Sequence, residues 1–151
     1  MTKLADVLTQ KRIVLDSNAR SKKRVLEEIC EHCAAPDEIE LFYHLLISRE
    51  KLGSTALGEG VALPHCRVPT LKQSVACFIR LQDGIDFQAP DNQPVDLIFG
   101  LFVPEGAIQT HLEFLAQLAG LFSQTLFREK IKTAQTVDDV YQLFTEFQHA
   151  E

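Results

Sequence analysis

The sequence predicts a single α/β domain, a layered sandwich in which helices flank a mixed central β-sheet. Helical patterns come first, strand patterns follow, and helical patterns return, with short connections throughout. The segment PVDLIFGLFVP, residues 94–104, is almost continuously apolar, which is typical of a strand covered on both faces. The 151 residues, 46% of them hydrophobic, are enough for one domain with one core, so residues 1–151 are assigned to one domain.

Two helices are predicted in the first third of the chain. Ser21 is a suitable N-cap for the first helix, and Pro36 ends it. Its apolar side carries Val25, Leu26, Ile29 and Cys33. The second helix is predicted over about 37–52, with acidic residues at its start and Gly53 at its end.

Residues 53–69 are rich in Gly, Pro and Thr, and we predict a loop there with a short strand at GVALPH, residues 60–65. Residues 74–81 alternate and contain β-branched side chains, which predicts a strand, and residues 85–87 predict a short one. The apolar run at 94–104 is predicted to be the central strand.

Three helices are predicted to close the chain. The first follows EGAIQ, residues 105–109, and the others cover about 124–133 and 137–147. The inward side chains of the first are expected to be Phe114, Leu115, Leu118 and Leu121 or Phe122.

The charge distribution argues against a nucleic-acid partner. The 15 Lys and Arg residues against 21 Asp and Glu give a net charge of −6, and the basic residues are scattered apart from 22–24. The start of the chain lacks the apolar segment of a signal peptide, and no later apolar run approaches the roughly 20 residues that cross a bilayer. We therefore expect a cytoplasmic protein without direct membrane insertion.

The cysteines are expected to be reduced thiols, because the chain shows no export signal. Cys30 and Cys33 have Cys-x-x-Cys spacing, but they lie in a helical pattern, and no second pair at ligand spacing completes a zinc site. The favoured interpretation is that they are small apolar residues of a helix. No metal and no cofactor is expected.

Arg49 is the first candidate site residue. The inward stripe of its helix contains Phe42, Leu45 and Leu46, and helical spacing predicts that Arg49 continues the stripe rather than Glu50. Taken alone, this pattern favours an arginine that lays its methylenes on the core rim and keeps its charged end in water. The helix ends just before the segment leading to His65, however, so the two side chains are candidates to meet across a loop.

His111 is the second candidate. Thr110 and Glu113 match a capping box, with Thr110 as N-cap, which places His111 in the first turn of a helix that follows the central strand. Open α/β sheets bind ligands at that edge, and helix N-termini attract anions. The alternative is a histidine near a cap that is bonded to a neighbouring carbonyl.

His65 stands in the stiffest part of the chain, GEGVALPHCRVP. Pro64 fixes its own φ, and Gly58 and Gly60 permit turns that other residues tolerate poorly, so the imidazole is presented with little backbone freedom. A rigid imidazole near an arginine and a second imidazole is suited to accept a phosphoryl group, because phosphoryl transfer depends on positioning and on charge neutralisation.

At these residues the chain resembles a known family. SREKLGSTALGEGVALPHCR, DNQPVDLIFGLFVPEG and THLEFLAQLAGLF resemble the IIA proteins of the bacterial phosphoenolpyruvate-dependent phosphotransferase system, in the fructose/mannitol and nitrogen-related class. The resemblance covers nearly the whole chain. It implies a mixed sheet flanked by helices. It also implies that His65, through Nε2, takes a phosphoryl group from a histidine-containing phosphocarrier protein, with Arg49 and His111 holding the phosphoryl oxygens.

Three further residues are considered as neighbours of the phosphoryl site. Cys66 stands where the family commonly has glycine; it either narrows the approach of the donor, adds a redox-sensitive thiol, or is an inert small side chain. Glu59 either orients a histidine, repels the phosphoryl group, or is a solvated loop carboxylate. Thr110 is included as the residue before His111.

Three classes of function are compatible with these residues. The organisation resembles the free-standing nitrogen-related branch, in which the phosphorylation state controls binding to regulatory target proteins; a sugar-delivering IIA with a separate IIB subunit is the alternative. A second class is a module that works without phosphorylation, in which His65, Cys66 and His111 bind a metal or the surface binds a partner. A third is a relative in which Cys66 excludes the donor.

Overall fold

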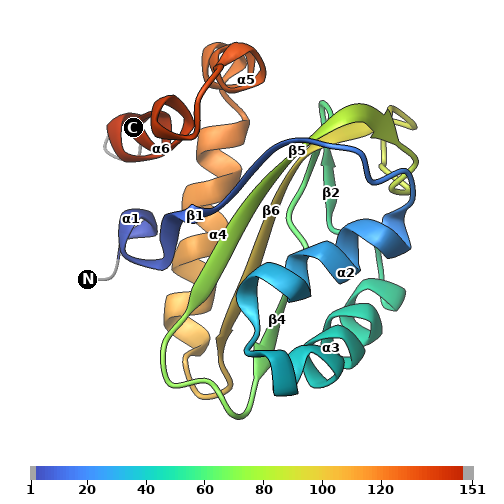
Figure 1. Ribbon diagram of the computed structural model, residues 1–151, viewed down its shortest axis with the longest axis vertical. Coiled ribbons are helices and arrows are strands. Elements are labelled where there is room, and N and C mark those ends of the chain that lie inside the picture. The colour runs from blue at the N-terminus through green and yellow to red at the C-terminus, as the bar shows by residue number, and fades with distance from the viewer. Residues whose placement is uncertain (1–2, 148–151) are drawn as a thin grey trace.

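A mixed six-stranded sheet lies between two layers of helices in the computed structural model, which describes residues 3–147 (Figure 1). In chain order the elements are α1 (Leu4–Val7), β1 (Leu8–Ser17), α2 (Lys22–Cys33), the 3-10 helix η1 (Pro36–Glu38), α3 (Ile39–Lys51), β2 (Ala56–Gly58), β3 (Val61–Ala62), β4 (His65–Val68), β5 (Val75–Ile85), β6 (Val95–Pro104), α4 (Ile108–Phe122), α5 (Thr125–Thr133) and α6 (Val137–Phe147). Within 3–147 no helix has the length and apolar character needed to cross a membrane.

The sheet has the order β1-β5-β6-β3-β2, and β4 also pairs with β6. Strands β1 and β5 are parallel, β5 and β6 are antiparallel, and both β3 and β4 run parallel to β6. The apolar run predicted as the central strand is therefore β6, which confirms that prediction. Its partners β3 and β4 follow each other along one side of it.

Each face of the sheet carries its own apolar core. Helices α1, α4, α5 and α6 cover one face, and α2 and α3 cover the other (Figure 1). Phe78 and Phe99 belong to the first core, while their strand neighbours Cys77 and Ile98 belong to the second. Because both faces are covered, these strands need apolar side chains at successive positions, which is the pattern seen in the sequence.

The helices agree closely with the prediction. Ser21 caps α2, where its Oγ accepts a hydrogen bond of 3.1 Å from the Arg24 backbone N–H. Helix α3 begins at Ile39, two residues later than expected, because Pro36 opens a 3-10 turn before it. The last two helices lie within a residue of their predicted ranges.

Three features of the strands were not predicted. The edge strand β1 was missed because residues 9–11 are polar and exposed. The segment 85–87 is not a separate strand, since β5 continues to Ile85. The loop predicted at 53–69 contains three short strands rather than one, and two of them pair with β6.

Candidate functional site

A cleft of about 440 Å³ opens at the edge of the sheet between the end of α3 and the start of α4. It brings His65, Arg49, His111 and Cys66 together. The remaining lining residues are Leu45, Ser48, Leu52, Arg67, Pro69 and Glu105. Elements that are far apart in sequence thus converge on His65.

The backbone holds His65 at an interruption between two strands. Strands β3 and β4 pair with the same side of β6, but Leu63 and Pro64 between them belong to neither. Pro64 has no N–H to donate, and its carbonyl accepts a hydrogen bond of 3.0 Å from the Leu101 N–H. His65 then resumes the pairing opposite Leu101, so its position is fixed by β6.

A hydrogen bond sets the tautomer of His65. Its Nδ1 lies 2.6 Å from the carbonyl oxygen of Leu63. A carbonyl only accepts hydrogen bonds, so Nδ1 carries the hydrogen and Nε2 keeps its lone pair. Burial, helped by the charge of Arg49, lowers the pKa of His65, although the bond to Leu63 and the charge of Glu50 oppose the shift. The ring is therefore neutral at pH 7, with the lone pair of Nε2 free.

His111 faces His65 from the first turn of α4. The two ring centroids are 5.1 Å apart, at an interplanar angle of 71°. The Nε2 atom of His111 is buried and has no hydrogen-bond partner among residues 3–147. Burial, together with the charges of His65, Arg67 and Arg49, lowers the pKa of His111 to about 4. This second imidazole is also neutral at pH 7.

The lowered pKa of His111 predicts a measurable titration. We expect the ring to stay neutral down to about pH 4, whereas an unfolded chain protonates it near pH 6.5. Between these values the unfolded state binds the extra proton, so His111 makes the fold less stable as the pH falls through this window. A histidine-ring NMR titration checks the value, and a midpoint above pH 6 for His111 contradicts the described environment.

The end of α3 corrects one detail of the sequence analysis. Glu50, rather than Arg49, continues the buried stripe from Phe42 and Leu46, because the inward residues follow a spacing of four. Glu50 is 5% exposed and accepts hydrogen bonds from the Thr55 backbone N–H at 2.9 Å and hydroxyl at 2.6 Å. The Lys22 ammonium lies 2.9 Å from the same carboxylate.

Arg49 is half-buried beside this network and lines the cleft. Its Nη1 donates a hydrogen bond of 3.1 Å to the Gly53 carbonyl oxygen, just beyond the end of the helix. The bond to Gly53 and the buried, hydrogen-bonded neighbour Glu50 together fix the position of the Arg49 guanidinium. The structure therefore places a cation near His65, as the sequence analysis expected, although it lies beside the apolar stripe and not on it.

Cys66 contributes a protonated thiol to the core side of the cleft. It is buried in the core under α2 and α3, and burial raises the pKa of its thiol to about 12. A protonated, buried thiol is a poor nucleophile and a poor metal ligand, which favours the inert small side chain among the three expectations. All four cysteines are free, and among residues 3–147 no three His, Cys, Asp or Glu side chains form a group able to hold a metal.

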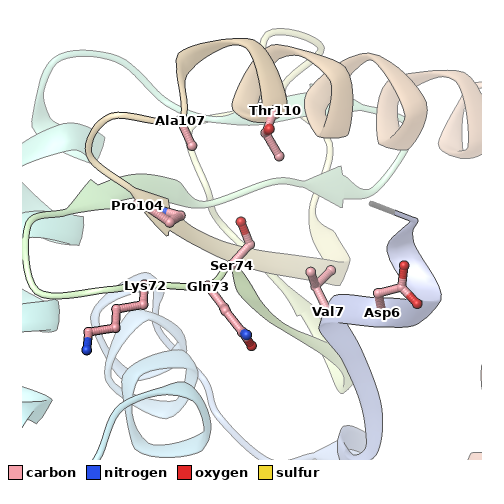
Figure 2. Close-up of a pocket in the computed structure, with 8 residues that line it drawn as sticks. All are labelled: Asp6, Val7, Lys72, Gln73, Ser74, Pro104, Ala107 and Thr110. Carbon is pink, nitrogen blue, oxygen red and sulfur yellow. The ribbon is translucent and has the colours of Figure 1, made fainter. Parts of the chain in front are cut away.

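The expected cap at Thr110 is wrong. Helix α4 begins at Ile108 with Ala107 as N-cap, and His111 N–H already donates to the Ala107 carbonyl at 3.0 Å. The Ala107 N–H donates a hydrogen bond of 3.1 Å to the Pro104 carbonyl, so the chain turns directly after β6 and the helix begins before Thr110. Thr110 instead lines another pocket, of about 420 Å³, which shares no lining residue with the cleft around His65. Figure 2 shows the Thr110 side chain at the start of α4. The other residues that line this pocket are Asp6, Val7, Lys72, Gln73, Ser74, Pro104 and Ala107.

Glu59 also lies apart from the cleft around His65. It occupies the tight turn between β2 and β3 with a φ of 58°, and its backbone N–H donates to Asp91 Oδ2 at 2.9 Å. Its carboxylate lies 3.8 Å from Arg128 and lines another cavity, of about 500 Å³. The structure thus brings neither Glu59 nor Thr110 into the group of residues around His65.

Arg67 is a cleft residue that the sequence analysis did not single out. It stands two positions after His65 in β4, and side chains two apart in a strand point to the same face. The spacing His-x-Arg was therefore a usable signal. Ser48 and Glu105 also line the cleft, but nothing in their sequence context marks them.

A neutral imidazole with a free Nε2 lone pair, a second imidazole and an arginine line one cleft at the sheet edge, and this set of groups is typical of a site suited to an anionic group. Residues 6–147 match the family described as the phosphoenolpyruvate-dependent sugar phosphotransferase system, EIIA 2. The chain is 37% identical to the nitrogen regulatory protein of Pseudomonas aeruginosa, over the full length of both chains. The chain belongs to the EIIA 2 family of that phosphotransferase system.

Solved structures agree with this assignment. The nitrogen regulatory protein IIA-Ntr from Neisseria meningitidis superposes with a TM-score of 0.89 at 42% identity, over 93% of this chain and 98% of that one. IIA mannitol from Escherichia coli superposes with a TM-score of 0.74 over 90% of this chain and 97% of that one, and at 21% identity it shows the shared fold alone. The predicted layered α/β fold is confirmed.

Proposed function

We propose that this protein is a regulatory phosphocarrier that accepts a phosphoryl group on Nε2 of His65 from a histidine phosphocarrier protein. The observation that carries the proposal is the bond between His65 Nδ1 and the Leu63 carbonyl, because it leaves the Nε2 lone pair free beside Arg49 and His111. Membership of the EIIA 2 family supports phosphoryl transfer as the chemistry.

The transfer step follows from this tautomer. The Nε2 lone pair of His65 attacks phosphorus, the nitrogen–phosphorus bond of the donor breaks, and its electron pair returns to the donor imidazole. Nδ1 keeps its hydrogen throughout, so no proton has to leave His65 during the transfer. The ring gains positive charge as the new bond forms, and the Leu63 carbonyl, which accepts from Nδ1, stabilises that charge.

Arg49 and His111 act on the phosphoryl oxygens. Phosphoryl transfer is catalysed mainly by positioning and by neutralising charge on these oxygens. Arg49 supplies a permanent positive charge that Gly53 holds in place. Nε2 of His111, buried without a partner among residues 3–147, gains one when it donates a hydrogen to a phosphoryl oxygen. This requires the Nε2–H tautomer of His111, which the neutral ring allows.

The regulatory branch is favoured over sugar delivery by the relatives. The full-length match at 37% identity and the solved structure at 42% identity are both named as nitrogen regulatory proteins. Phosphorylation replaces a neutral ring by a group with up to about two negative charges, and a partner that contacts the cleft rim detects this change. In this proposal the targets are regulatory proteins in the cytoplasm, whereas a separate IIB subunit is the partner in the sugar-delivering alternative.

Phosphorylation of His65 is testable by intact-mass spectrometry. After incubation with phosphoenolpyruvate, enzyme I and the histidine phosphocarrier, we expect an acid-labile gain of about 80 Da, one phosphoryl group, in the wild type. His65→Ala should show no gain and keep its unfolding midpoint, and His44→Ala, an exposed control, should be labelled normally. Labelling of His65→Ala rejects the assignment of the acceptor, and an unlabelled wild type rejects the phosphocarrier function.

The regulatory role needs a second measurement. A target protein bound by one form should lose or gain affinity when His65 is phosphorylated. Equal affinity of a target for both forms contradicts control by the phosphorylation state.

A further inference from the structure

Arg67 lies on the same side of β4 as His65. Cys66 and Val68 are buried in the core under α2 and α3, so His65 and Arg67 project from the opposite side of the strand. Two positions along a strand correspond to roughly 6.6 Å between Cα atoms. An extended arginine side chain spans a distance of this order, so its guanidinium can reach a group bound at the His65 ring.

The guanidinium of Arg67 is available for such a group. Arg67 is exposed and forms no ion pair with any residue in the described part of the chain. Glu105 lines the same cleft but does not pair with it. The charge of Arg67 is among the causes of the lowered pKa of His111, which agrees with its place beside the two rings.

We infer that Arg67 is a second phosphoryl-binding arginine, which contacts the oxygens of the phosphoryl group once it is on His65. This inference rests on the proposed phosphorylation of His65. Arg49 approaches the ring from α3 and Arg67 from β4, so the two guanidinium groups meet the phosphoryl oxygens from different elements. In the free protein Arg67 has no such partner, so the contact exists only after transfer.

A contact made only in the phosphorylated state changes the transfer equilibrium. Arg67 stabilises phosphorylated His65 and leaves the free form unaffected, so it shifts the phosphoryl group toward this protein and away from the donor. An arginine that only helps the donor to dock changes the rates in both directions and leaves the equilibrium constant unchanged. The equilibrium constant therefore separates the two roles.

The test compares Arg67→Gln, Arg67→Lys and Arg20→Gln with the wild type. Arg20 is an exposed arginine outside the cleft, and it serves as the matched control. Each protein is mixed with a fixed amount of phosphorylated donor, and the phosphorylated fractions of both proteins are measured at equilibrium. We expect the transfer equilibrium constant to fall about tenfold in Arg67→Gln. It should fall less in Arg67→Lys, because lysine keeps the positive charge but lacks the planar set of N–H donors of a guanidinium.

A phosphorus NMR titration gives a second readout that involves no donor. A nearby cation favours the dianion and lowers the phosphoryl pKa, so this pKa should rise in Arg67→Gln and remain at the wild-type value in Arg20→Gln. Unchanged equilibrium and unchanged phosphoryl pKa in Arg67→Gln overturn the inference, and a change in rate alone then assigns Arg67 to donor docking. Failure to phosphorylate the wild type overturns the proposed function instead.

Discussion

Glu50→Ala is expected to lower the free energy of unfolding by about 3 kcal/mol, at the lower end of the range for breaking a buried ion pair. The substitution leaves the Thr55 N–H and hydroxyl without their acceptor and removes the carboxylate from Lys22. The lower end applies because the side chain of Lys22 is 19% exposed and regains water once the carboxylate is gone. Lys22, Glu50 and Thr55 connect the start of α2, the end of α3 and the loop before β2. Removal of the Glu50 carboxylate therefore weakens the contacts that hold these elements together beside Arg49.

Urea unfolding followed by circular dichroism measures this change. Glu40→Ala, an exposed glutamate on the same helix, is the matched control and should change the free energy of unfolding by less than about 0.5 kcal/mol. The loss in free energy of unfolding for Glu50→Gln should lie between those of Glu50→Ala and Glu40→Ala. The Gln side-chain oxygen still accepts a hydrogen bond from Thr55, but the attraction to the charge of Lys22 is gone. A loss below about 1 kcal/mol in Glu50→Ala contradicts a structural role for the buried carboxylate.

The long helices and the central strand were predictable because each has a periodicity that burial imposes. Helix α2 has a capping serine and an apolar stripe, and β6 is apolar at successive positions because both faces of the sheet are covered. Strand β1 was not predictable from its own residues. It is an edge strand whose exposed polar positions hide the alternation, and it is held by its parallel pairing with β5.

The positions of His65, Arg49 and His111 were predictable in outline, whereas their immediate partners were not. A helical stripe advances by three or four residues, so Arg49 and Glu50 were both compatible with it. The choice depends on Thr55 and Lys22, which lie on other elements. The capping box at Thr110 is a local pattern, but α4 begins earlier, at Ile108, because the chain turns directly after Pro104.

The tautomer of His65 was also beyond the sequence. Pro64 indicated a stiff backbone, but only the folded chain shows that the Leu63 carbonyl turns back onto Nδ1 of His65. The place of Arg67 in the site was also beyond the sequence, because it depends on the strand geometry that puts Arg67 and His65 on the same side of β4. Sequence patterns thus indicated the candidate residues, whereas the folded backbone around His65 determines the tautomer of its ring and the side of the strand on which Arg67 lies.

Arg49→Gln is expected to slow phosphoryl transfer to His65 about 100-fold, the lower end of the effect of removing one preorganised electrostatic group. The bond from Arg49 to Gly53 holds the guanidinium near the cleft before the donor arrives, so little reorganisation is needed during transfer. Arg49→Lys should recover part of the rate, because it restores the charge without the fork of donors. Rapid-quench measurement of the initial transfer rate tests this, and Lys51→Gln, an exposed cation at the same helix end, is the control.

The pH dependence distinguishes this role from a loss of fold or of docking. The charge of Arg49 helps to lower the pKa of both His65 and His111, so its removal lets both values rise. A protonated His65 is not a nucleophile, so the acid limb of the rate profile should move to higher pH in Arg49→Gln, and the deficit should be larger at pH 6 than at pH 8. A deficit of the same size at every pH argues that Arg49 acts on the phosphoryl oxygens or the donor without shifting the pKa of either ring.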